Sequence, residues 1–259
     1  MFSPVMSETE FKLPKAPIIE AVLDVDCDMP PGLEVANLET LAKDAFRGQY
    51  PKARKVLVHE HKIETKPDEA PKVSTRQAVQ AFQFLQEDEK QLIQVRTQGF
   101  SFNKLAPYSS LDEYLPEIKR TWQLFVSVAS PVQIRVVRLR YINRILIPAE
   151  GGNVILADYL DKICPSSPVE GSLRLIGFLN QTTAVENATG NQVNVILTAQ
   201  PVEEGSLPLI LDITVASAQP GDVKNWAWLS GQIQSLRGLK NRIFKNTLTK
   251  KCLNLFQQP

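Results

Sequence analysis

The sequence has 259 residues, of which 43% are hydrophobic and 22% charged, and its 29 Lys and Arg nearly balance its 28 Asp and Glu. This composition excludes a disordered or collagen-like chain and is typical of one large globular unit or two intimately packed halves. Its three cysteines show no C-x-x-C spacing, which argues against a disulfide framework and a structural zinc site. The opening residues 1–4 do not resemble a secretory signal, and no apolar run reaches the roughly 18 residues of a membrane span. We therefore expect a cytoplasmic protein without membrane attachment.

The first half of the chain predicts strands and helices after a flexible leader of residues 1–12. Alternating apolar residues predict a strand over Ile18–Cys27, and helical spacing predicts a helix over residues 37–50 with Asn37 as its N-cap. Further strands are expected over residues 55–65, 78–86 and 90–104, the last two joined as a hairpin by the acidic turn at 87–89. A helix with one apolar stripe then follows from Ser110 to about Val128.

The second half repeats this order of elements. We expect a strand over residues 132–147, a short helix near 153–162, strands over 172–185, 192–202 and 207–218, and a long helix from Asp222. Both halves then read β-α-β-β-β-α. The sequence predicts an α+β fold built as a tandem duplication, residues 13–130 and 131–259, with pseudo-twofold symmetry and antiparallel sheets covered by the long helices.

An arginine stripe is the most concentrated basic feature of the chain. The alternation of the strand at 132–147 slips by one residue at Val136–Val137, which predicts a β-bulge there. With the bulge counted, one face of the strand carries four arginines, Arg135, Arg138, Arg140 and Arg144. They could hold the phosphates of a nucleic acid while Phe100 or Phe102 stacks on bases. Alternatively, they pair with acids on neighbouring strands, and the near-neutral net charge favours this reading.

A metal site is a second chemical hypothesis. His59 and His61 share one face of a predicted strand because side chains alternate along a strand, and Asp24, or else Asp26 or Asp28, could supply a third ligand. This set would suit a metal-dependent hydrolase, but a solvated strand face explains the same residues. The sequence lacks a P-loop, a G-x-S-x-G elbow and the other local catalytic signatures. We expect no cofactor.

Four stretches resemble a sporadically distributed family of uncharacterised bacterial proteins. They are the opening Leu13–Val22, which is similar to L-P-x-x-P-I-x-E-A-V; the strand Leu92–Arg96 followed by Phe100, Asn103 and Pro107-Tyr108; the central R-Y-I-N-R at Arg140–Arg144; and Phe244 with Thr249 in the closing helix. The resemblance implies a bacterial cytoplasmic protein that folds as one unit. It implies no particular reaction.

The motifs place polar side chains inside otherwise apolar strands, namely Glu20, Gln94, Asn103 and Asn143. Buried polar groups need partners, so these residues are expected either to form a structural network, with Glu20 or Asn103 contacting Arg140 or Arg144, or to line a polar ligand pocket. The leading functional hypothesis is a non-catalytic binding or protein-interaction module, as a homo-oligomer or with a protein partner. Nucleic-acid binding and metal-dependent hydrolysis are the alternatives.

Overall fold

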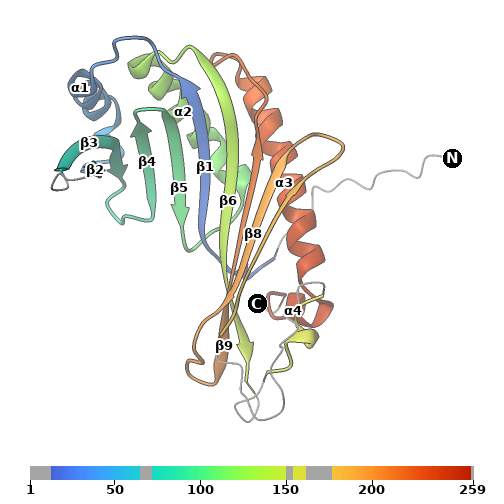
Figure 1. Cartoon of the computed structure of the whole chain (residues 1–259). Coiled ribbons are helices and arrows are strands. Elements are labelled where there is room, and N and C mark those ends of the chain that lie inside the picture. The colour runs from blue at the N-terminus through green and yellow to red at the C-terminus, as the bar shows by residue number, and fades with distance from the viewer. Residues whose placement is uncertain (1–12, 65–71, 150–153, 162–176, 258–259) are drawn as a thin grey trace.

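The computed structural model describes residues 13–64, 72–149, 154–161 and 177–257. Its elements, labelled in Figure 1, are β1 Ile18–Asp28, α1 Val35–Phe46, β2 Lys52–Glu64, β3 Lys72–Leu85, β4 Gln91–Arg96, β5 Gly99–Leu105, α2 Leu111–Ala129, β6 Gln133–Pro148, the 3₁₀ helix η2 Leu156–Asp158, β7 Leu179–Val185, β8 Gln192–Ala199, β9 Ser206–Ser217, α3 Trp226–Thr247 and α4 Lys250–Asn254.

The described strands form a single antiparallel sheet of nine strands, so the protein is of mixed α+β class with an antiparallel sheet. The strand order is β2-β3-β4-β5-β1-β6-β9-β8-β7. The strands β1 and β6 lie next to each other at the centre, and each continues outward through strands that follow it in the chain. Residues from both sides of this central pair belong to one hydrophobic core.

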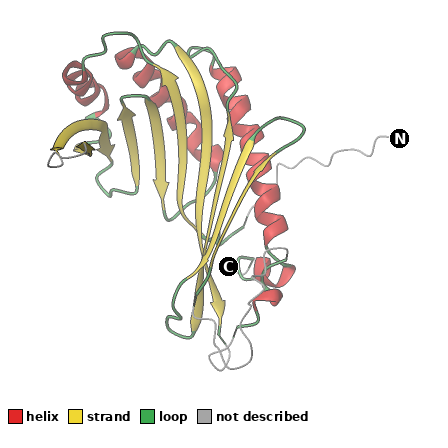
Figure 2. Ribbon diagram, in the orientation of Figure 1, coloured by secondary structure: helices red, strands yellow, loops and turns green. Residues whose placement is uncertain are grey.

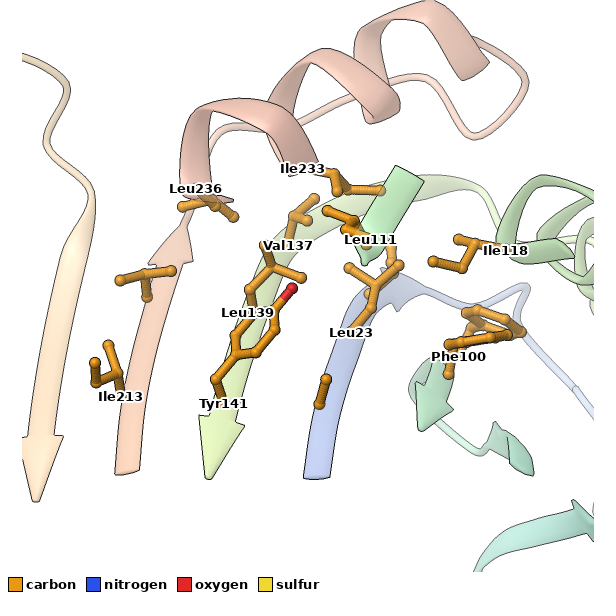
Figure 3. Packing of buried hydrophobic residues seen from close by; sticks show 14 of the residues in the cluster. Leu23, Phe100, Leu111, Ile118, Val137, Leu139, Tyr141, Ile213, Ile233 and Leu236 are labelled. Atoms are coloured by element: carbon orange, nitrogen blue, oxygen red, sulfur yellow. The ribbon is translucent and has the colours of Figure 1, made fainter. Parts of the chain in front are cut away.

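The helices lie on one face of the sheet (Figure 2). The helix α2 begins within one residue of the predicted start at Ser110, and Ser110 caps it by accepting a hydrogen bond from the backbone N–H of Glu113. In Figure 3, side chains of α2 and α3 meet the strands from the same side, with Ile233 and Leu236 of α3 above Val137 and Leu139 of β6. None of the helices in the described part of the chain is long and apolar enough to cross a bilayer.

Two predicted elements differ from the structure in the first half. The strand expected over residues 90–104 is a hairpin of β4 and β5, so four strands rather than three follow α1. The turn depends on Gly99, whose φ of +149° and close approach to β1 exclude a side chain: a Cβ there would lie 2.1 Å from the carbonyl oxygen of Val25. The first helix begins at Val35, so Asn37 lies inside it and is not its N-cap.

The second half also departs from the predicted order. The short helix expected near residues 153–162 is represented, within the described residues 154–161, by the 3₁₀ turn η2. The strand expected over residues 172–185 is β7, which begins at Leu179, and residues 172–176 lie outside the described part. The closing helix ends at Thr247 and a separate short helix, α4, follows. The pattern β-α-β-β-β-α therefore describes neither half as the structure has it.

The predicted β-bulge is present in β6, slightly earlier than expected. Asp26 pairs with Val136 and Cys27 with Ile134, so Arg135 is the extra residue on β6. Beyond the bulge, alternate residues such as Leu139 are buried on the helix side. The residues between them point to the other side, which we call the open face. The bulge thus sets the register that separates the arginines from the core.

Candidate functional site

All four arginines of the predicted stripe are neutralised by carboxylates on neighbouring segments. The closest nitrogen–oxygen distances are 3.1 Å for Arg135–Asp28, 3.2 Å for Arg138–Asp26, 2.6 Å for Arg140–Asp212 and 2.6 Å for Arg144–Glu203. Arg140 is held as a fork, because both its Nε and its Nη2 donate to the Asp212 carboxylate, and this pairing raises the pKa of Arg140. The structure therefore agrees with the second interpretation of the arginine stripe, in which the arginines pair with acids on neighbouring segments.

This pairing weakens the case for a nucleic-acid interface on the open face. Asp26 also accepts from Arg96 at 2.7 Å, so one carboxylate lies between two guanidinium groups. Phosphate binding draws on unneutralised positive charge, and here that charge is met inside the protein. The expected stacking residues are not available either, because Phe100 and Phe102 are buried in the core at 0% and 3% exposure. Their place on the helix side follows from the alternation of β5.

Three of the four polar motif residues form one row across the open face. Asn103 donates to Glu20 at 2.9 Å, and Gln94 donates to Asn103 at 3.1 Å. Gln83 extends the row by donating to Gln94 at 3.2 Å. This row links β3, β4, β5 and β1, and Arg140 lies close enough for the Glu20 charge to raise its pKa. The network expected from the buried polar residues exists, with Asn103 rather than an arginine as the hydrogen-bonding partner of Glu20.

The predicted metal ligands are separated by the sheet order. Asp24 lies on β1 and His59 and His61 on β2, and the strands β3, β4 and β5 lie between them. Neighbouring strands are about 4.8 Å apart, which places these residues roughly 19 Å from each other. Within the described residues, no group of three His, Cys, Asp or Glu side chains could hold a metal ion. Asp24 instead accepts a hydrogen bond from Ser101.

A cavity lies on the opposite side of the sheet, between α3, the segment before β1 and the loop that follows β5. It is open to solvent at its mouth, and the space that water-sized molecules can occupy within it is about 60 Å³. Its apolar wall consists of Leu13, Ala16, Pro17, Ile18, Leu111 and Phe244. Its polar groups belong to Tyr108, Ser109, Ser110, Tyr141, Asn143, Arg237, Lys240 and Asn241. An apolar pocket with a few convergent polar groups is the usual form of a small-molecule site.

Two tyrosine hydroxyls meet in this cavity. Tyr141 points from β6 toward the helix layer (Figure 3), and its hydroxyl lies 3.3 Å from that of Tyr108. Burial raises the pKa of both phenols, so both stay protonated at neutral pH. In such a pair one hydroxyl donates to the other, which leaves one hydroxyl proton for a further acceptor. The pair can therefore donate a hydrogen bond to a ligand oxygen.

Lys240 brings an amine into the cavity from α3. Its side chain is only 9% exposed, and Nζ lies 4.0 Å from the centre of the Tyr141 ring. Among the described residues no carboxylate forms an ion pair with it. Burial, and secondarily the nearby Arg237 charge, lowers the pKa of Lys240 to about 7. The amine is therefore partly neutral at physiological pH, and the aromatic face is its electrostatic partner when it is charged.

Arg237 lies one turn before Lys240 and supplies a permanent charge. Its Nη1 donates to Asp112 at 2.7 Å and to Gln234 at 3.3 Å. Both of these bonds use Nη1, and a guanidinium has five N–H groups, so Nε and Nη2 can serve a ligand. Asn143 lines the same cavity but is anchored, because its Nδ2 donates to the backbone oxygen of Leu211 at 2.9 Å. It is the one polar motif residue on this side of the sheet.

The stretches that carry the sequence resemblance converge on the cavity. The opening stretch, Pro107-Tyr108, the central R-Y-I-N-R and the closing helix all contribute lining residues. Local bonds hold them together: the backbone N–H of Arg144 donates to the Pro17 carbonyl at 2.8 Å, and that of Ala106 to the Ile19 carbonyl at 3.0 Å. Segments that are distant in the sequence therefore form one site.

Sequence reasoning missed Lys240 and Arg237 as site residues, although a signal was present. The buried residues of α3 include Leu229, Ile233, Leu236, Lys240, Phe244 and Thr247, and Leu239 is buried beside them. Their spacing of three and four residues is that of a core-facing helix stripe. A lysine at such a position must find an unusual environment, because burying an ammonium group is costly. The amphipathic pattern alone therefore marks Lys240.

No known protein family, no curated protein and no solved structure matches this chain. The resemblance to a family of uncharacterised bacterial proteins stays a prediction. Two regions of the protein gather polar side chains, the open face of the sheet and the cavity beside α3.

Proposed function

We propose that this protein is a non-catalytic binding protein whose cavity beside α3 takes a small organic anion, a carboxylate with a short apolar part. The observation that carries this proposal is the convergence of Arg237, Lys240 and the Tyr108–Tyr141 pair in one otherwise apolar cavity. Within the described residues, Asp112 pairs with Arg237, and no carboxylate pairs with Lys240. The cavity thus has an excess of hydrogen-bond donors and positive charge over acceptors.

The chemistry of the lining selects the class of ligand. A guanidinium fork with free N–H groups matches the planar geometry of a carboxylate. The wall formed by Pro17, Ile18 and Phe244 favours an apolar body next to it. Because the space inside the cavity is about 60 Å³, enough for a few water-sized groups, the ligand is a molecule of few carbon atoms rather than a macromolecule.

The open face supports this proposal by contrast. Its arginines pair with carboxylates and its amides with one another, as in the Arg140–Asp212 fork and the row that ends at Glu20, although the buried Nε of Arg96 has no hydrogen-bond partner. Such a network stabilises strand register and leaves few unpaired donors for a partner. The cavity has the opposite character, since among the described residues Lys240 has no carboxylate partner and Asp112 pairs with Arg237 alone of these two cations. The cavity on the helix side of the sheet is therefore a more suitable ligand site than the open face.

Binding of defined probes tests the proposal. Pyruvate, lactate, benzoate and inorganic phosphate are titrated into the protein while ligand-observed NMR or calorimetry records binding. We expect saturable binding of the carboxylates, weakened about tenfold or more by Arg237→Met, because a hydrogen bond to a charged group contributes about 1.5–3 kcal/mol. Arg47→Met, at an exposed arginine of α1, is the matched control. Failure of every carboxylate to bind the wild type, or equal binding by Arg237→Met, would disprove the proposal.

The duplication also belongs to this proposal. From the central pair the strands continue outward as β5, β4 and β3 next to β1, and as β9, β8 and β7 next to β6. The helices α2 and α3 follow β5 and β9 respectively. This correspondence supports two related halves, residues 13–130 and 131–259, with β2 as an additional edge strand and with α2 and α3 as the covering helices. Superposition of β1-β5-α2 on β6-β9-α3 tests it, and an unrelated handedness would contradict it.

We further infer a bacterial cytoplasmic protein, because Cys27 and Cys252 are both free and buried, as is usual in a reducing compartment. A homo-oligomer or another protein partner remains a prediction, which light scattering of the purified protein measures. A strictly monomeric protein would remove the homo-oligomer.

A further inference from the structure

Building on the proposed binding function, we infer that Lys240 forms a reversible imine with the carbonyl carbon of a small oxo acid whose carboxylate is held by Arg237. The ligand class thus narrows from carboxylates to carboxylates that carry an adjacent carbonyl group. Three features of the cavity support this step: the placement of the amine, its spacing from the guanidinium, and the nearby hydroxyl proton.

The amine is enclosed, and no ion pair within the described residues fixes it. Its Nζ lies over the Tyr141 ring, 4.0 Å from the ring centre, and the side chain lines the cavity. A lysine desolvated next to another cation is the usual form of an amine nucleophile, because the neutral amine becomes accessible near neutral pH. Burial together with Arg237 provides this environment here, with the pKa of Lys240 at about 7.

The spacing of Arg237 and Lys240 suits one bifunctional ligand. They are three residues apart on α3, and side chains with this spacing lie on the same helix face. Both line the same cavity. A molecule whose carboxylate and carbonyl carbons are adjacent can therefore place the first on the guanidinium and the second on the amine.

The tyrosine pair can assist the addition. The lone pair of Nζ forms a bond to the carbonyl carbon while the carbonyl oxygen takes the free hydroxyl proton of the Tyr108–Tyr141 pair, which lines the same cavity, and a proton of the new ammonium group returns to the tyrosine oxygen. The same hydroxyl then protonates the departing oxygen of the carbinolamine, which leaves as water as the C=N bond forms, and the remaining N–H proton restores the tyrosine. One molecule of water is released, and nothing is oxidised or reduced.

Reductive trapping tests the imine. The protein is incubated with pyruvate and sodium borohydride, intact mass measures the adduct, and peptide mapping locates it. We expect one equivalent of adduct at Lys240, no such adduct in Lys240→Met or Lys240→Arg, and about tenfold slower labelling in Arg237→Met. Lys119→Met, at an exposed lysine of α2, should label as the wild type does. Lactate has the same carboxylate but no carbonyl group, so it should protect Lys240 without forming an adduct.

The pH profile separates this reaction from surface labelling. Labelling at Lys240 should rise through about pH 7, because burial and the Arg237 charge lower the pKa of the amine to about 7. The other groups around it are Asp112, which pairs with Arg237, and the protonated phenols of Tyr108 and Tyr141. Exposed lysines should label only at higher pH. Pyruvate that binds saturably but leaves Lys240 unmodified would overturn the imine and leave the binding function standing. Absence of pyruvate binding would overturn both.

Discussion

Replacing Lys240 with Met should change how the stability of the protein depends on pH. Burial lowers the pKa of this lysine from 10.5 to about 7. One pKa unit corresponds to about 1.36 kcal/mol, so the buried ammonium destabilises the folded state by about 5 kcal/mol when it is fully protonated. Methionine has a similar length and no charge, so Lys240→Met removes this cost. It also loses the cation–π contact with Tyr141, which contributes about 1–2 kcal/mol.

The direction of the pH effect follows from proton binding. Between about pH 7 and pH 10.5 the unfolded chain keeps a proton on Lys240 that the folded protein has released. Stability therefore rises with pH across this window, and below it the full cost is present. Integration over about pH 6 to pH 8.5 gives the wild type a gain of about 2 kcal/mol relative to Lys240→Met. A folded pKa one unit higher or lower moves this gain to about 1 or 3 kcal/mol.

Urea denaturation at the two pH values measures this difference. The upper limit of about pH 8.5 avoids the buried thiol of Cys27, whose pKa is raised to about 12 and which begins to favour unfolding at higher pH. Lys119→Met, at an exposed position, should keep the wild-type pH dependence. If Lys240→Met also keeps it, the lysine is not desolvated in the folded protein and the argument for a reactive amine fails with it.

Three further predictions concern the sheet. Arg140→Ala should destabilise by about 1–3 kcal/mol because it strands the 7%-exposed Asp212, and the double variant with Asp212→Ala should cost less than the sum of the two, as a double-mutant cycle in urea will measure. Gly99→Ala should cost at least about 3 kcal/mol, since its Cβ would overlap the backbone of β1, and a melting temperature close to that of the wild type would contradict the described hairpin. The wild-type protein should not shift the electrophoretic mobility of added RNA or DNA at low salt, because Arg138 and Arg140 are already paired with carboxylates. A variant in which both arginines are replaced by Glu should give the same result. A salt-sensitive shift by the wild type that this variant abolishes would restore the nucleic-acid hypothesis.

The sequence predicted those elements whose pattern is local. Alternation predicted β1 and β6 to within one or two residues, and the apolar stripe with Ser110 predicted α2 to within one. The bulge in β6 was also readable, because the slip in alternation shows in the sequence itself. The hairpin of β4 and β5 was missed because the turn at Thr97-Gln98-Gly99 is very short and its one local signal is a single glycine, although a strand of 15 residues is already longer than usual.

The site depended on contacts that local patterns do not contain. The Arg140–Asp212 pair joins residues 72 positions apart, so the sequence could suggest that the arginines pair with acids on neighbouring strands but not which acid each one meets. The separation of Asp24 from His59 depends on strand order, which a hairpin count does not determine. Lys240 differs from these, because its place on the buried stripe of α3 needs only the helical period.

The two faces of the sheet thus carry charge in opposite ways, and this difference favours the cavity as the functional region. On the open face each arginine of the stripe has a carboxylate partner, and the free energy of those pairs is already realised in the folded protein. In the cavity, burial of the Lys240 ammonium group beside Arg237 lowers the free energy of unfolding. Among the described residues no acid pairs with this amine, since Asp112 pairs with Arg237. An anion that reaches both groups would recover part of this cost, so binding and stability are coupled there. Thermal stabilisation by pyruvate should accordingly be larger for the wild type than for Lys240→Met, and the reverse would contradict the coupling.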